Sequence, residues 1–175
     1  MKTYVKLVAL AFLLVSVIAG VAMSGASDVR AEEKGLAQQV QGSWKLVSIY
    51  NELDGKKSDV FGSNPRGSMI FTSNGRFSLI IMKESLPKFA ANSRVKGTAE
   101  ENLAVVQGSV ALFGSYKLDS EKNDTVILHV EGCTFPNWDA QDQKRIAKFT
   151  GDEMNFITPA AAIGGTNYAV WKRVK

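Results

Sequence analysis

The 175-residue sequence predicts an all-β fold: one antiparallel up-and-down barrel of eight strands with a single short helix. Runs of alternating apolar and polar residues, typical of strands, recur through most of the chain and are separated by turn residues. Short connections between consecutive runs favour a meander in which neighbours in sequence pair. The first run opens with Gly42-Ser43-Trp44 and the last ends with Trp171-Lys172-Arg173. These two ends become neighbouring strands if the sheet closes on itself.

The first 31 residues are predicted to be a bacterial export signal. Lys2 and Lys6 precede an apolar run from Leu7 to Met23, which is the order found in signal peptides. Cleavage after Ala31 would leave residues 32–175 as one barrel domain, in the periplasm or secreted. An uncleaved membrane anchor is the alternative, because the apolar run is almost long enough to span a bilayer. The membrane is expected as a partner only through this segment.

Each predicted strand is a run of strand-forming residues bounded by Gly, Pro, Asn or Asp. The eight predicted strands cover residues 44–50, 69–72, 76–82, 110–118, 124–131, 141–149, 153–158 and 167–174.

Local signals support the turns and the helix between these strands. Asn74-Gly75 is typical of a tight hairpin, because both residues tolerate a positive φ. Thr98 and Glu101 have the spacing of a capping box, which predicts a helix over residues 98–108. We expect this helix to pack over one mouth or flank of the barrel.

The composition excludes several classes of function. Half of the net charge of +4 arises in the first 31 residues, and no basic stripe with interspersed aromatic residues remains to bind nucleic acid. The chain has one histidine and one cysteine, too few for a set of metal ligands at the usual spacing. No phosphate loop or nucleophile elbow is present. No cofactor and no metal are therefore expected.

Several motifs resemble the lipocalin-like domain family of bacterial and fungal proteins, most of them without an assigned activity. Gly42-Ser43-Trp44 is similar to the lipocalin entry motif. The resemblance implies a small barrel with an interior cavity. It also implies a structural role for Gly42, Trp44 and Arg173, with the Trp44 indole at the closed end and the Arg173 guanidinium across it. The similar stretches are residues 42–48, 64–67, 74–78, 113–116, 129–131, 135–138, 143–145 and 171–174.

One predicted strand carries the only candidates for chemistry. His129, Glu131 and Cys133 alternate along it, so all three side chains are expected on one face of the sheet. If that face lines the interior, His129 can act as an acid or base, with Glu131 or Arg145 setting its protonation, as an isomerase or cyclase would require.

The same strand also supports the opposite orientation. Val126, Leu128 and Val130 form an apolar row that would face the core and turn His129 and Glu131 outward. The sequence leaves both orientations open.

The function predicted from these observations is binding of a small, largely apolar molecule inside the barrel. Four side chains are the expected ligand contacts: His129, Arg145, Tyr116 and Trp138. Two alternatives remain: an enzyme that uses His129 and Glu131 in the same cavity, and a fully packed barrel whose surface binds another protein.

Overall fold

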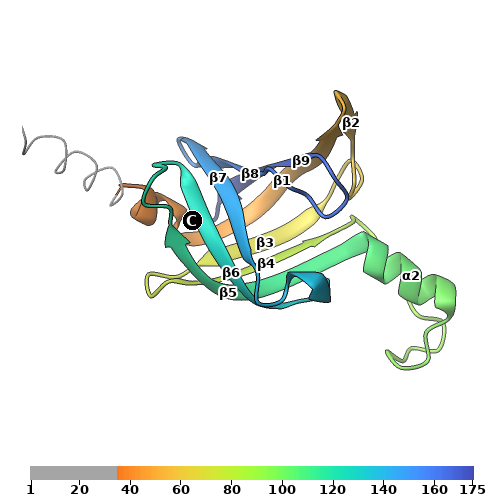
Figure 1. Ribbon diagram of the computed structural model, residues 1–175. Helices are drawn as coiled ribbons and strands as arrows, with labels where there is room; N and C mark the ends of the chain where they lie inside the picture. The colour runs from red at the N-terminus through yellow and green to blue at the C-terminus, as the bar shows by residue number, and fades with distance from the viewer. Residues whose placement is uncertain (1–34) are drawn as a thin grey trace, which may run out of the picture.

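The computed structural model describes residues 35–175, which form a closed barrel of eight antiparallel strands with a ninth short strand appended (Figure 1). The fold class predicted from the sequence is therefore confirmed. The predicted export signal, residues 1–31, lies outside the described residues. The strands are β1 (Gly42–Leu53), β2 (Lys56–Ser58), β3 (Arg66–Phe71), β4 (Arg76–Met82), β5 (Ser109–Leu118), β6 (Thr125–Cys133), β7 (Asp142–Thr150), β8 (Glu153–Thr158) and β9 (Thr166–Arg173).

The barrel closes where the first strand meets the last. β1 pairs with β3 on one side and with β9 on the other, and the remaining neighbours follow chain order. The sequence prediction made the first strand too short and missed β2. This strand is a fully exposed hairpin arm beyond the barrel, paired only with the far end of β1. The turn between them uses positive φ at Asp54 (50°) and Gly55 (73°).

Alternation of residues along the strands separates the core from the surface. In β4, Phe77, Leu79 and Ile81 are buried, whereas Ile80 is 43% exposed. Such a period of two places every second side chain in the barrel interior. Burial of each large apolar side chain contributes roughly 1.5–3 kcal/mol to folding.

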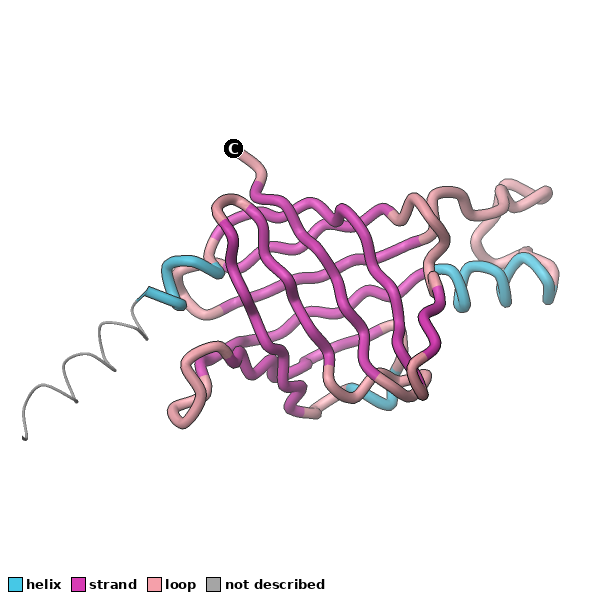
Figure 2. The backbone as a smooth tube through the Cα atoms, turned by 90° about the horizontal axis from the view of Figure 1, so that it is seen from above, coloured by secondary structure: helices cyan, strands magenta, loops and turns pink. Residues whose placement is uncertain are grey.

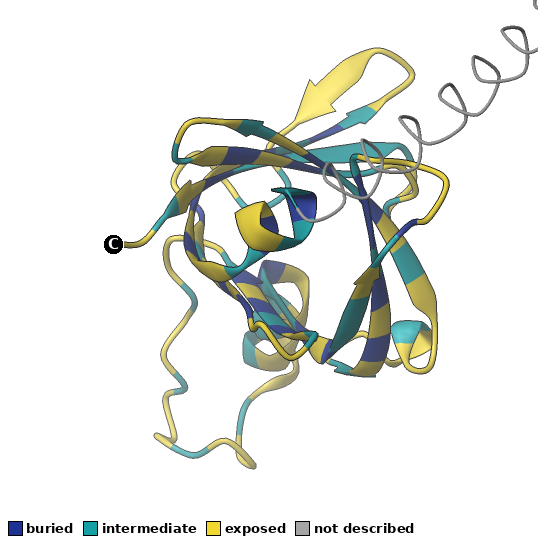
Figure 3. Cartoon of the chain, turned by 90° about the vertical axis from the view of Figure 1, so that its left-hand side faces the viewer, coloured by how far each residue is buried: buried dark blue, intermediate teal, exposed yellow. Residues whose placement is uncertain are grey.

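One end of the barrel is plugged by a short helix at residues 35–40 (Figure 3). Its residues Leu36 and Val40 are buried in the core. The fully buried Trp44 donates a hydrogen bond from Nε1 to the Val40 carbonyl oxygen, at 2.8 Å. The plug and the first strand therefore close this end together.

Helix α2 (Ala99–Gly108) lies at the other end of the barrel (Figure 2). The predicted capping box is confirmed: the Glu101 amide donates to Thr98 Oγ1 at 3.2 Å, and the Thr98 amide donates to Glu101 Oε2 at 2.9 Å. The expected packing over the mouth holds only for the last turn, where Val106 and Gln107 lie at the open end of the barrel. The rest of the helix projects away, with Leu103 55% exposed (Figure 1), because its apolar residues are too few to form a continuous face.

Candidate functional site

A cavity of about 430 Å³ occupies the half of the barrel interior away from the plug. Loop residues from the β2–β3, β6–β7 and β8–β9 connections and the last turn of α2 line its mouth, and inward residues of β1, β4, β5, β7, β8 and β9 form its wall. The volume is in the range of sites that bind small molecules. The main apolar wall residues are Ile49, Leu79, Ile81, Val110, Leu112, Phe156, Ala169 and Trp171.

Arg145 is the one charged residue among those that line this cavity in the described part of the chain. It lies on β7 and is 5% exposed. Nη1 donates to the Lys144 carbonyl oxygen at 2.8 Å and to Gln143 Oε1 at 3.4 Å. Burial lowers the pKa of the guanidinium from its usual value to about 10, because the interior hydrates the charge poorly.

Trp138 covers Arg145 at the mouth of the cavity. It ends the 3-10 turn η1 (Pro136–Trp138) in the connection between β6 and β7. Its ring packs edge-on against Phe135, with centroids 5.5 Å apart, and its centroid lies 5.9 Å from Arg145 Cζ. That separation is within the range of a cation–π contact. Trp138 therefore both lines the cavity and holds the loop over the guanidinium.

Asn51 holds the β8–β9 loop in place at the mouth of the cavity, and the sequence analysis did not identify this residue. This buried residue of β1 donates from Nδ2 to the Gly164 carbonyl oxygen and to Asn167 Oδ1, both at 2.9 Å. It thereby ties the β8–β9 loop to the barrel wall. An asparagine in an otherwise apolar inward row was the available signal, because buried amides are nearly always hydrogen-bonded.

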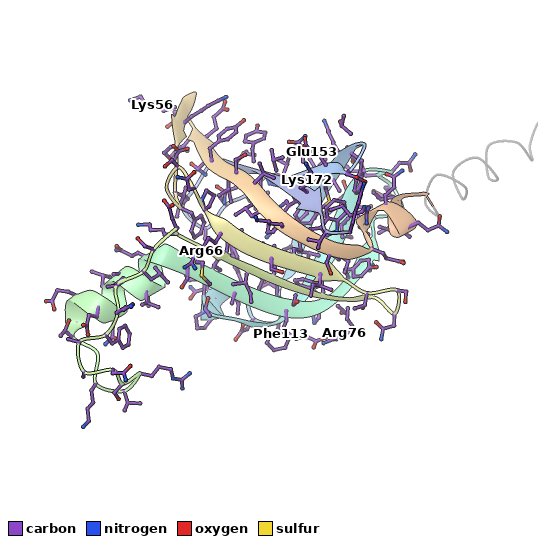
Figure 4. The ribbon with its side chains drawn as sticks, turned by 180° about the vertical axis from the view of Figure 1, so that it is seen from behind. Lys56, Arg66, Arg76, Phe113, Glu153 and Lys172 are labelled. Carbon is purple, nitrogen blue, oxygen red and sulfur yellow. The ribbon has the colours of Figure 1, made fainter. Side chains whose placement is uncertain are left out.

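His129 and Glu131 lie on the outer face of β6, away from the cavity. His129 Nδ1 is 2.8 Å from Asp142 Oδ1, and both side chains are about half exposed. Glu131 accepts a hydrogen bond from Arg76 Nη2 at 2.7 Å, and this hydrogen bond lowers the pKa of its carboxyl group. Figure 4 shows Arg76 on the outside of the barrel.

The apolar row of the same strand explains this orientation. Val126, Leu128 and Val130 are fully buried in the core, so the side chains between them must point outward. The expected ligand contact at His129 is therefore corrected, because neither His129 nor Glu131 lines the cavity. The alternative enzyme that would use both residues inside the barrel loses its acid–base pair.

Cys133 does not share the face of His129 and Glu131, contrary to the sequence prediction. A β-bulge shifts the register of β5 and β6 at Phe113 and Gly114, so Cys133 pairs with the buried Leu112. One extra residue in a strand reverses the alternation that follows it. The half-buried thiol packs against the core, and burial raises its pKa.

Tyr116 lies at the plugged end and does not line the cavity. Its hydroxyl donates to the Thr72 carbonyl oxygen at 2.9 Å, and its ring meets Phe71 edge-on with centroids 4.9 Å apart. The prediction of a ligand contact is corrected, because the β4–β5 register pairs Arg76 with Ser115 and so places Tyr116 beside the hairpin at Thr72–Arg76.

Residues 35–175 contain neither a metal-binding cluster nor a helix that could cross a membrane. No cluster of three or more His, Cys, Asp or Glu side chains that could hold a metal ion is present in this range. No helix in the same range is long and apolar enough to cross a bilayer.

Comparison with known proteins adds one match. A family model described as a lipocalin-like domain matches residues 41–174, which is nearly all of the described barrel. No curated protein matches the chain.

Proposed function

The chain belongs to the lipocalin-like domain family, and from this membership and the cavity we propose that the protein binds a small, largely apolar molecule inside its barrel. The cavity is the observation that carries the proposal. An apolar cavity of about 430 Å³ that opens at one end of the barrel has the size and lining of a small-molecule site, whereas a barrel that acts only through its surface needs no such cavity.

The wall supplies the main driving force for binding. Transfer of an apolar ligand from water to this surface contributes about 25 cal/mol for each Å² that becomes buried. A few polar groups then set the orientation of the ligand, as in most small-molecule sites. Arg145 and Trp138 are the predicted contacts that fit this role, since both line the cavity.

The proposed place of binding is the periplasm or the exterior of a bacterium, which rests on the basic and apolar order of residues 1–31. Expression of the full chain with fractionation of the cells tests it. Recovery from the periplasm or medium, with a new N-terminus after Ala31, is the expected result. Recovery of the intact chain from the membrane fraction would contradict it.

The binding proposal is tested by titration with a neutral apolar fluorophore, N-phenyl-1-naphthylamine. We expect saturable one-to-one binding. Ile81 and Ile80 are adjacent on β4, but Ile81 lines the cavity and Ile80 faces outward. Ile81→Trp should therefore fill the cavity and abolish binding, whereas Ile80→Trp should bind like the unaltered chain.

Ala169→Leu is a milder filling variant on the opposite wall, in case Ile81→Trp folds poorly. Thermal melting shows which variants fold. No saturable binding to the unaltered chain, or equal binding by the Ile80 and Ile81 variants, would contradict the proposal.

A further inference from the structure

We propose that the molecule held in the cavity is an apolar carboxylic acid whose carboxylate pairs with Arg145 while its apolar body lies against the rest of the wall. This inference rests on the proposed function and specifies the chemical class of the ligand. It follows from the surroundings of one buried guanidinium.

Arg145 differs from the other arginines whose contacts the structure describes. Arg66 donates to a carbonyl oxygen, Arg76 pairs with a carboxylate, and Arg173 donates to two carbonyl oxygens and lies over a tryptophan ring. Arg145 is the one buried arginine of these four, yet no carboxylate among residues 35–175 forms an ion pair with it. A buried charge without a counter-charge destabilises the fold, because the charge loses its hydration and gains no ion-pair partner in return.

The hydrogen bonds of Arg145 leave part of the guanidinium unused. Its described acceptors are the Lys144 carbonyl oxygen and Gln143 Oε1, and the bond from Nη2 to Gln143 is long, at 3.5 Å. Nε has no acceptor among the described residues. Arginine presents its donors as a rigid planar fork, and a carboxylate can accept from two of them at once.

The charge balance favours a carboxylate over a more highly charged anion. No second cation is among the described residues that line the cavity, and most of the others are apolar. One guanidinium neutralises one carboxylate, whereas a phosphate monoester carries a charge of about −1.5 to −2 at neutral pH. An acid with a single carboxylate therefore matches both the charge and the wall.

The test compares decanoate with decan-1-ol, which have the same number of carbon atoms and differ in the head group. Each compound is titrated as a competitor of the neutral fluorophore N-phenyl-1-naphthylamine at pH 8, where the acid is ionised. The unaltered chain should prefer decanoate by about tenfold to a hundredfold, the range expected for a hydrogen-bonded charge pair in place of a neutral contact.

Substitutions on β7 then test whether Arg145 causes the preference for decanoate. Arg145→Met should bind decan-1-ol with little change and lose the preference for the acid, and Arg145→Lys should keep part of it. Lys144→Met is the matched control, because Lys144 is the next residue on β7 but its side chain is 62% exposed. This control should keep the full preference.

Each result decides between the two proposals. No displacement by either compound, together with no binding of the fluorophore, overturns the proposed function itself. Equal affinity of the unaltered chain for decanoate and decan-1-ol overturns only the assignment of an acid, and needs no variant that might fail to fold. A preference for decanoate that survives in a folded Arg145→Met chain also overturns it.

Discussion

The guanidinium of Arg173 lies over the indole ring of Trp44, with Cζ 4.2 Å from the ring centroid. The two residues face each other across the β1–β9 pair, where the barrel closes. Arg173 also donates to the carbonyl oxygens of Gln39 and Gln41, each at 2.6 Å. One side chain of the last strand therefore holds the first strand and the end of the plug helix together.

Arg173→Met should destabilise the fold, because it removes this cation–π contact and both hydrogen bonds. We expect the free energy of unfolding to fall by about 2 kcal/mol. Urea denaturation measures it. Lys172→Met, at the exposed neighbouring position, should change stability by less than about 0.5 kcal/mol. Equal effects of the two substitutions would contradict the structural role of Arg173.

Gly114→Ala should disrupt the bulge between β5 and β6. A Cβ atom at Gly114 would lie 1.9 Å from the His129 carbonyl oxygen, so the backbone of one strand would have to move. The expected loss is about 1–3 kcal/mol, as for other cases of overpacking. Gly35→Ala is the control, because a Cβ there meets no atom within 4 Å. An unchanged melting temperature for Gly114→Ala would contradict this close approach of β5 to β6 at Gly114.

Asp119 should contribute to the loss of stability in acid. Its carboxylate accepts from the Glu121 amide at 3.0 Å and from Lys144 Nζ at 3.2 Å. These contacts lower its pKa below the ordinary 3.8, the backbone hydrogen bond more than the lysine. A group whose pKa is lower in the folded state stabilises the fold above its unfolded pKa, and the contribution disappears as the pH falls through the folded value.

Asp119→Asn should therefore lower stability at neutral pH and make the decline below pH 3.8 less steep. Urea midpoints measured over a series of pH values check this. If the urea midpoints of the variant and of the unaltered chain fall in parallel as the pH decreases, other carboxylates account for the acid sensitivity.

His129→Ala should leave ligand binding unchanged, because the ring lies outside the barrel beside Asp142. Titration with the neutral fluorophore checks the affinity, and Trp138→Ala is the matched variant on the cavity side. We expect a clear loss only for Trp138→Ala. Weaker binding in the His129 variant would instead place the site on the outer surface of β6.

The parts of the fold that follow from alternation could be predicted from the sequence. The row of Val126, Leu128 and Val130 supported the orientation of β6 that the structure has, although the sequence left the opposite orientation open, and Asn74-Gly75 identified a hairpin that the structure contains. In both cases the signal is local, because side-chain direction in a strand has a period of two and a tight turn needs residues that accept a positive φ.

The sequence predictions failed where the orientation of a side chain depends on contact with a residue far away in the sequence. The bulge that turns Cys133 inward depends on the approach of Gly114 to His129, which no pattern within β6 reveals. Arg145 is similar. Lys144 and Arg145 are both basic neighbours, and only the register of β7 against β6 and β8 decides which of them enters the cavity. Arg145 is among the ligand contacts expected from the sequence, but no sequence pattern indicates that its charge is buried.

Native mass spectrometry of the mature protein, purified gently from its own host, tests the central claim most directly. We expect a bound small molecule that dissociates on activation, and no such molecule on the Ile81→Trp variant prepared in the same way. A bare protein mass, with no uptake after exposure to a lipid extract of the host, would contradict the claim that the barrel interior is a binding site.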